Sequence, residues 1–202
     1  MPKGFFFLIS AQFASGLADN ALLILGIAFL SEQGYAGWWA PLLKFSFTLS
    51  YVFLAPLMGP LADAIDKAKL MAYMNALKLV GVGFVLTSFH PMLAFAIVGM
   101  AASAYAPAKY GLVTETVPAE DLVRANGWLE VTVVMSVILG TACGGLLLAS
   151  NALPAMQAFN LYLTTNLDIP VTTELAGAFV SLIVIYALAA ALNLGIPNLN
   201  IR

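Results

Sequence analysis

Five ionisable side chains stand inside long apolar stretches of this chain: Asp19, Lys44, Lys78, Lys109 and Glu130. Such groups cost several kcal/mol in hydrocarbon, so each is expected to be functional or paired with a partner. Their surroundings are apolar because 62% of the 202 residues are hydrophobic and only 9% are charged. A soluble domain carries about 25% charged residues and cannot hide so much apolar surface. The composition therefore excludes a soluble enzyme and predicts an integral membrane protein.

Asp19 lies near the middle of the first apolar stretch. Gln12 and Ser15 precede it by seven and four residues, which places all three on one face of a helix. A polar stripe on an apolar helix faces protein or a water-filled cavity, where a carboxylate can bind a cationic group or a proton. The alternative is a structural carboxyl group, neutral or paired with a lysine. Lys78, with Asn75 on the same helical face, either pairs with an acid on a neighbouring helix or extends its ammonium group inward. A structural and a functional role both stay open for it.

Lys109 and Glu130 lie at similar depth on neighbouring antiparallel stretches, so we expect a salt bridge between them. That bridge either fixes the two helices to each other or forms part of a gate or head-group site at the cytoplasmic side. Lys44 lies one turn from the outer end of its stretch, where a lysine can extend its ammonium group to the interface.

The remaining residues contain no catalytic set. A membrane hydrolase needs a nucleophile with a base or a metal centre, and the only histidine, His90, stands in a tight turn before Pro91. The single cysteine, Cys143, excludes an intramolecular disulfide and a cysteine-based metal site. A net charge of −2 without a basic arm excludes nucleic acid as a partner. We therefore expect no enzymatic activity, no cofactor and no metal.

Six helical spans must position the charged side chains. A span needs about 20 apolar residues, and the chain offers six such runs in one bundle covering residues 1–202. The predicted spans are residues 4–30, 40–62, 70–89, 92–113, 127–150 and 175–196. Residues 151–174 are only moderately apolar, which predicts an interfacial helix; an irregular loop or an extension of the fifth span are the alternatives.

The distribution of lysine and arginine predicts the orientation of these spans. Five basic residues fall on one side of the six-span arrangement, and the opposite connections carry none. They are Lys3, Lys67, Lys69, Arg124 and Arg202. Because positive charge is retained in the cytoplasm, both termini are predicted to be cytoplasmic. Tyr35, Trp38 and Trp39 then lie at the outer interface, which suits their amphipathic rings.

The connection between the second and third spans, Gly59 to Leu70, resembles the loop motif of the major facilitator superfamily. In that motif a glycine is followed by an aspartate four residues later and then by a basic pair, here Asp63 with Lys67 and Lys69. We expect Gly59 to allow close helix approach and Asp63 to accept hydrogen bonds from a helix N-terminus and a basic residue. The sequence departs from the motif where Ala64 replaces the usual arginine and Asp66 the second glycine.

Further stretches are similar to the bacterial lysophospholipid transporter family within that superfamily. They are Ala11-Gln12-Phe13, Asp19-Asn20-Ala21-Leu22, Asn75 to Gly81, Ala104 to Gly111 with its Pro-Ala-Lys-Tyr-Gly run, and Ala125-Asn126-Gly127 followed by Glu130. The resemblance implies a transporter in the bacterial inner membrane. It would flip lysophospholipids, such as lysophosphatidylethanolamine, from the outer to the inner leaflet, where an acyltransferase re-acylates them.

A lysophospholipid carries an anionic phosphate, and lysophosphatidylethanolamine adds an ammonium group. A carboxylate and a lysine on one cavity can bracket such a zwitterion. The predicted substrate-binding residues are Asp19, Asn20, Gln12, Lys78, Lys109 and Tyr105. The predicted gating or structural residues are Glu130, Gly59, Asp63, Lys67 and Lys69.

Superfamily transporters have twelve spans, with the substrate between two six-span halves, and this chain corresponds to the N-terminal half. We therefore expect a fragment, a partner that supplies the second half, or a homodimer. Two other functions stay open: transport of a different amphiphile or drug, and a non-transporting scaffold that docks an acyltransferase.

Overall fold

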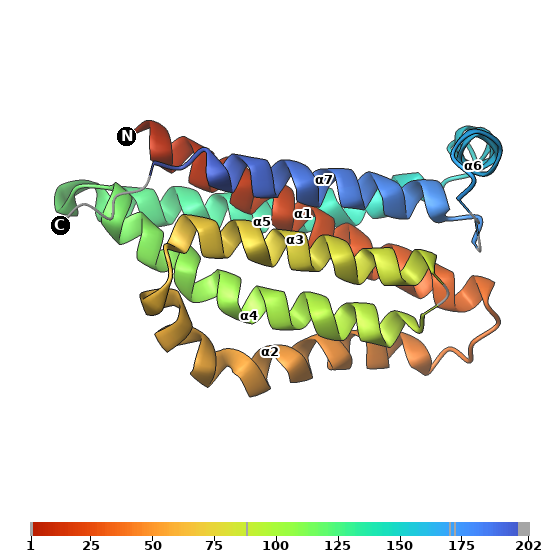
Figure 1. Ribbon diagram of the computed structural model, residues 1–202, viewed down its shortest axis with the longest axis horizontal. Coiled ribbons are helices and arrows are strands. Elements are labelled where there is room, and N and C mark those ends of the chain that lie inside the picture. Colours follow the sequence, from red (N-terminus) through yellow and green to blue (C-terminus); the bar gives the residue numbers. More distant parts are fainter. Residues whose placement is uncertain (1, 88, 170, 172, 198–202) are drawn as a thin grey trace.

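The computed structural model describes residues 2–87, 89–169, 171 and 173–197, and within them the secondary structure is helical (Figure 1). The long helices are α1 (Lys3–Glu32), α2 (Trp39–Ala64), α3 (Lys67–Leu86), α4 (Pro91–Thr116), α5 (Leu122–Leu147) and α7 (Ala176–Leu194). Two shorter elements are the 3₁₀ turn η1 (Ala119–Asp121) and the helix α6 (Leu153–Asn166). Six of the described helices are long and apolar enough to cross a membrane, which confirms the predicted all-α membrane fold.

The helices differ from the predicted runs mainly where charged residues join a helix end. α5 begins at Leu122 rather than at residue 127, so Arg124 lies in its first turn. α3 begins at Lys67 rather than at residue 70, because the Asp66 side chain accepts a hydrogen bond from the backbone N–H of Lys69 (3.0 Å). Such a cap satisfies a free donor at a helix N-terminus. Charge therefore marks the edge of the apolar run, whereas the helix itself continues beyond it.

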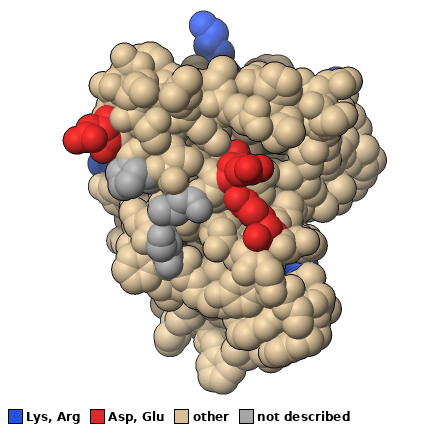
Figure 2. Space-filling model, turned by 90° about the vertical axis from the view of Figure 1, so that its right-hand side faces the viewer, with Lys and Arg blue, Asp and Glu red and all other residues tan. Residues whose placement is uncertain are grey.

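The six long helices run alternately up and down, so α1, α3 and α5 begin at one end of the bundle, the N-terminal end (Figure 1). Lys3, Lys67, Lys69 and Arg124 all belong to helix starts at this end, whereas Arg202 lies outside the described residues. The opposite end carries acidic side chains near the middle of its face and basic ones only at its margin (Figure 2). Glu32 ends α1 there, and Asp168 and Glu174 lie in the connection between α6 and α7.

α1 packs mainly against α5 and α7, α3 packs against α4 and α7, and α4 carries α2. Two glycines allow particularly close approach. A Cβ atom on Gly99 of α4 would lie 2.3 Å from the carbonyl oxygen of Phe47 in α2, and one on Gly140 of α5 would lie 2.5 Å from that of Leu17 in α1. α2 also contains Pro56 and Pro60, which interrupt its hydrogen-bond ladder, and it curves in Figure 1. α2 and α5 have the smallest shares of buried residues among the six spans.

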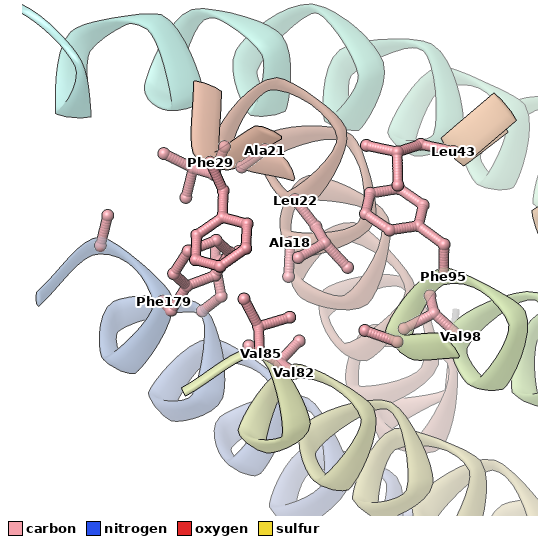
Figure 3. Packing of buried hydrophobic residues seen from close by; sticks show 14 of the residues in the cluster. Ala18, Ala21, Leu22, Phe29, Leu43, Val82, Val85, Phe95, Val98 and Phe179 are labelled. Carbon is pink, nitrogen blue, oxygen red and sulfur yellow. The ribbon is translucent and has the colours of Figure 1, made fainter. Parts of the chain in front are cut away.

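Two apolar cores fill the bundle, one toward each end. Toward the opposite end, side chains from α1, α2, α3, α4 and α7 converge (Figure 3), and the rings of Phe29 and Phe179 meet edge to face at 5.9 Å. The second core, toward the N-terminal end, includes Phe5, Leu70 and Leu112. Polar side chains of α1 and α3 lie between the two cores, and they form the site described below.

The segment 151–174 forms a helix rather than an irregular loop over most of its described length. α6 is seen end-on in Figure 1, so it lies across the ends of the spans and not parallel to them. The Asn160 side chain receives the backbone N–H of Gly177 (3.1 Å) and donates to the carbonyl oxygen of Glu174 (2.9 Å). The carboxylate of Glu32 accepts from the Thr173 hydroxyl (2.6 Å) and the Glu174 backbone N–H (2.8 Å). The Asn160 bonds attach α6 to the start of α7, and the Glu32 bonds attach the residues just before α7 to the end of α1.

Candidate functional site

A buried ion pair joins α1 to α3 at mid-depth. Lys78 is 1% exposed, and its Nζ donates to Oδ2 of Asp19 at 2.7 Å and to Oγ of Ser15 at 3.0 Å. The hydroxyl of Tyr186 on α7 donates to Oδ1 of the same carboxylate at 2.5 Å. The Lys78 ammonium also lies 5.0 Å from the centre of the Tyr105 ring, within the range of a cation–π contact. Both carboxylate oxygens of Asp19 therefore have partners within the protein.

A row of amides continues from this pair into the contact between α3 and α7. Ser15 Oγ donates to Oδ1 of Asn75 (2.7 Å), and Nδ2 of Asn75 donates to Oδ1 of Asn193 (3.3 Å). Asn75 and Asn193 are fully buried. Ser15, Asn75, Lys78, Asp19, Tyr186 and Asn193 together form what we call the polar seam of α1, α3 and α7. Burial makes each of these bonds expensive to break, so the seam fixes the three helices relative to one another.

A cavity of about 190 Å³ opens beside the ion pair and is lined by α1, α2, α3 and α4. Of the predicted substrate-binding residues, the structure brings together Gln12, Asp19, Lys78, Tyr105 and Lys109 in its wall. The Tyr105 ring is buried, and its hydroxyl is one of two buried side-chain groups in the described part of the chain without a hydrogen-bond partner. The ring lines the cavity, whereas the hydroxyl itself is buried behind the wall, where a group without a partner is costly.

The prediction of a salt bridge between Lys109 and Glu130 is wrong. Oε1 of Glu130 instead accepts a hydrogen bond from the Tyr110 hydroxyl at 2.7 Å, and the described residues contain no salt bridge to Lys109. α5 packs chiefly against α1 rather than α4. Lys109 and Glu130 therefore lie at a similar depth, but their side chains do not point toward each other. Lys109 is left in the cavity wall, 4.6 Å from the centre of the Tyr110 ring.

Three other predicted residues lie away from the cavity. Asn20 donates to the carbonyl oxygen of Gly16 in its own helix (2.8 Å), and its Cβ faces Gly140 of α5. Gly59 does not bring two helices together here, because a Cβ atom at this position would meet open space. Asp63 is exposed and receives no hydrogen bond within the described part of the chain, and Asp66 caps α3 in its place.

The basic pair of the loop divides into two environments. Lys67 reaches Glu115 of α4 at 2.5 Å, and its aliphatic stem lies over Gly111, where a Cβ atom would come within 2.6 Å of Lys67 Cε. The glycine of the Pro-Ala-Lys-Tyr-Gly run therefore leaves room for a lysine from the neighbouring helix. Lys69 is exposed and borders a separate pocket between α3 and the end of α7.

Sequence reasoning missed three residues of the site. Tyr51 of α2 lines the cavity, Tyr186 of α7 binds Asp19, and Asn193 ends the polar seam. Tyr186 and Asn193 stand seven residues apart in an otherwise apolar run, which places them on one helix face. That spacing was the available signal. Tyr51 gave none, because a lone aromatic residue in a span is ordinary.

Comparisons with known proteins agree with this architecture. The family model described as Major Facilitator Superfamily matches residues 4–194. The lysophospholipid transporter LplT of Citrobacter koseri is 37% identical over 172 residues, which are 83% of this chain and 43% of that protein. The proteins of the same name from Yersinia enterocolitica and Serratia proteamaculans are 39% and 40% identical over 73% and 69% of this chain, and 36% and 35% of their own lengths.

The chain thus spans less than half the length of these curated relatives. No solved structure matches it. The family model covers most of the chain, and the six spanning helices agree with the fold that the sequence motifs predict. The chain belongs to the Major Facilitator Superfamily.

Proposed function

We propose that this chain forms one six-helix half of a transporter that moves lysophospholipids from the outer to the inner leaflet of the bacterial inner membrane. The relatives named as lysophospholipid transporters support this substrate class. The second half would come from further protein or from a second copy of the chain, since superfamily transporters bind substrate between two halves. An acyltransferase that re-acylates the delivered lipid is the expected functional partner.

The observation that carries the proposal is the charge balance of the cavity. Lys78 and Asp19 neutralise each other at 2.7 Å, whereas Lys109 lines the same cavity without a salt bridge among the described residues. One unneutralised ammonium group then remains, and it favours an anion. We assign the lipid phosphate to Lys109. Charge-assisted hydrogen bonds of this kind are the strong ones.

This assignment changes the role predicted for Asp19. A carboxylate whose two oxygens already accept from Lys78 and Tyr186 is a poor partner for the ammonium group of lysophosphatidylethanolamine. The proposed cavity therefore recognises the phosphate and is tolerant toward the rest of the head group. Asp19 acts as a positioning residue that holds Lys78 and the wall of the cavity in place.

The proposed orientation follows from the basic residues at the N-terminal end, which would lie in the cytoplasm. Tyr35, Trp39 and His90 cluster at the opposite end, with ring centres 5.1–5.5 Å apart. The outer interface is a favourable environment for such amphipathic rings.

Uptake of radiolabelled lysophosphatidylethanolamine by spheroplasts that produce the protein in its native form tests the proposal. Loss of a charge-assisted hydrogen bond costs about 1.5–3 kcal/mol, so Lys109→Ala should reduce uptake by roughly 10- to 150-fold at normal protein abundance. Lys44→Ala is the matched control, because Lys44 is exposed on α2 outside the cavity lining and its ammonium group lies 4.9 Å from the centre of the Phe47 ring.

Competition separates the proposed substrate from other amphiphiles. Lysophosphatidylglycerol should compete with the labelled lipid about as well as unlabelled lysophosphatidylethanolamine, and a monoacylglycerol without phosphate should not compete. Wild-type uptake by Lys109→Ala would overturn the phosphate site. Equal competition by monoacylglycerol would instead favour a transporter of neutral amphiphiles.

A further inference from the structure

A second concave surface, separate from the charged cavity, lies on another face of α1. Ile9, Phe13 and Leu17 of α1 recur every four residues and form its floor. Leu188 and Leu192 of α7 form one wall, and Thr132 of α5 contributes to the other. The groove holds about 450 Å³. Its lining is almost entirely apolar, so neither water nor a charged head group is a suitable occupant.

The groove occupies the half of the bundle toward the N-terminal end. At about 1.5 Å per residue, Ile9 and Leu17 lie roughly 9 and 21 Å along α1 from Lys3. Leu192 stands two residues before the end of α7 at the same end. One leaflet of a bilayer has roughly 15 Å of hydrocarbon. The groove therefore runs along most of one leaflet, parallel to the direction of its acyl chains.

Two basic side chains belong to the helix starts that lead into this groove. Lys3 opens α1, and Arg124 lies in the first turn of α5. Both are exposed, and neither forms a salt bridge within the described part of the chain. A lipid whose chain occupied the groove would carry its phosphate toward this same end, where such charges are complementary to it.

We propose that a diacyl phospholipid of the leaflet at the N-terminal end binds here, with one acyl chain in the groove and its phosphate held by Lys3 and Arg124. Three helices contact the chain in the groove, whereas a flat lipid-facing surface contacts it from one side. The larger number of close contacts favours binding by dispersion. This proposal does not depend on the transported substrate, since the groove and the charged cavity lie on different faces of α1.

Photo-crosslinking tests the groove. The purified protein is reconstituted in liposomes that contain phosphatidylglycerol with a diazirine in one acyl chain. Labelling should concentrate on residues 9–17 and 185–192. Ala14→Trp fills the groove and should reduce that labelling by at least roughly fivefold. Ser10→Trp, at an exposed position of the lining, should also reduce the labelling. This second variant keeps the test valid if Ala14→Trp impairs folding. Ala142→Trp, exposed on α5 outside the lining, is the matched control and should leave it unchanged.

Two further arms identify the lipid. Replacing Lys3 and Arg124 by glutamine should reduce labelling by phosphatidylglycerol but not by a diazirine-bearing diacylglycerol, which has no phosphate. Even labelling of the exposed faces of α2, α5 and α7, or labelling unaffected by Ala14→Trp and Ser10→Trp, would overturn the proposal. Preferential labelling by a diazirine-bearing lysophosphatidylglycerol would also overturn it, and would assign the groove to the transported lipid class. The uptake assay of Lys109→Ala tests the charged cavity alone, so the two proposals can fail independently.

Discussion

Replacing Lys78 by methionine removes the charge from the polar seam while keeping a long side chain that fills the same space. Removal of one partner from a buried ion pair costs about 3–5 kcal/mol when the other charge is left without compensation. Asp19 retains partial compensation here, because its side chain is 22% exposed to the cavity and the Tyr186 hydroxyl still donates to it. We therefore expect Lys78→Met to lower the free energy of unfolding by about 2–3 kcal/mol.

Removing the other charge of the pair should destabilise the protein more. Asp19→Asn leaves the ammonium group of Lys78, whose side chain is only 2% exposed, without a counter-charge. Its remaining partners are neutral: the introduced amide oxygen, the Ser15 hydroxyl and two tyrosine rings. The expected loss is about 3–5 kcal/mol. The double variant contains neither charge, and it should recover most of the loss of either single variant, because replacing a buried pair by neutral groups is often tolerated.

Unfolding in detergent micelles, followed by helical circular dichroism, measures these differences. Lys44→Met is the control, and it should change the free energy of unfolding by less than about 0.5 kcal/mol because the side chain is exposed. Unchanged stability in Lys78→Met would refute a folded state held by this pair. A double variant whose loss equals the sum of the two single losses would refute the direct coupling inferred from the 2.7 Å contact.

Three further substitutions test contacts between helices. Gly99→Ala should lower the free energy of unfolding by about 1–3 kcal/mol, because its Cβ would lie 2.3 Å from the carbonyl oxygen of Phe47. Gly83→Ala, whose Cβ meets open space, should raise it by up to about 1 kcal/mol, and an equal loss in both would contradict the close contact between α2 and α4. Lys67→Ala should cost less than about 1 kcal/mol, since Glu115 is 40% exposed. A coupling above about 2 kcal/mol in a double-mutant cycle between Lys67 and Glu115 would show that this ion pair is stronger than its exposure implies.

Depth along the bilayer could be predicted from the sequence, because apolar run lengths and the positions of lysine and arginine report it directly. The polar stripe of Gln12, Ser15 and Asp19 was predicted from its helical spacing, and all three line the cavity. The rotation of one helix against another could not be predicted. Lys109 and Glu130 share a depth, yet α5 packs on α1 and α4 packs on α2 and α3, so their side chains diverge.

Asn20 was predicted to bind substrate, but it lies away from the cavity. Its neighbour Asp19 faces the cavity, and one residue further along a helix turns the side chain by about 100°. Asn20 therefore faces α5 and hydrogen-bonds to its own helix. Tyr186 lies 167 residues from Asp19, and no local pattern connects residues so far apart.

The distance between the partners of the polar seam also constrains how the protein is made. Spans enter the membrane in order from the N-terminus, so Asp19 of α1 enters before Lys78 of α3. Tyr186 belongs to α7, the last of the six spans. Until those helices arrive, the carboxylate must stay protonated, hydrated or shielded by the insertion machinery, because hydrocarbon offers it no partner. The polar groups of α1 and α3 are therefore fully satisfied only when α7 has joined the bundle.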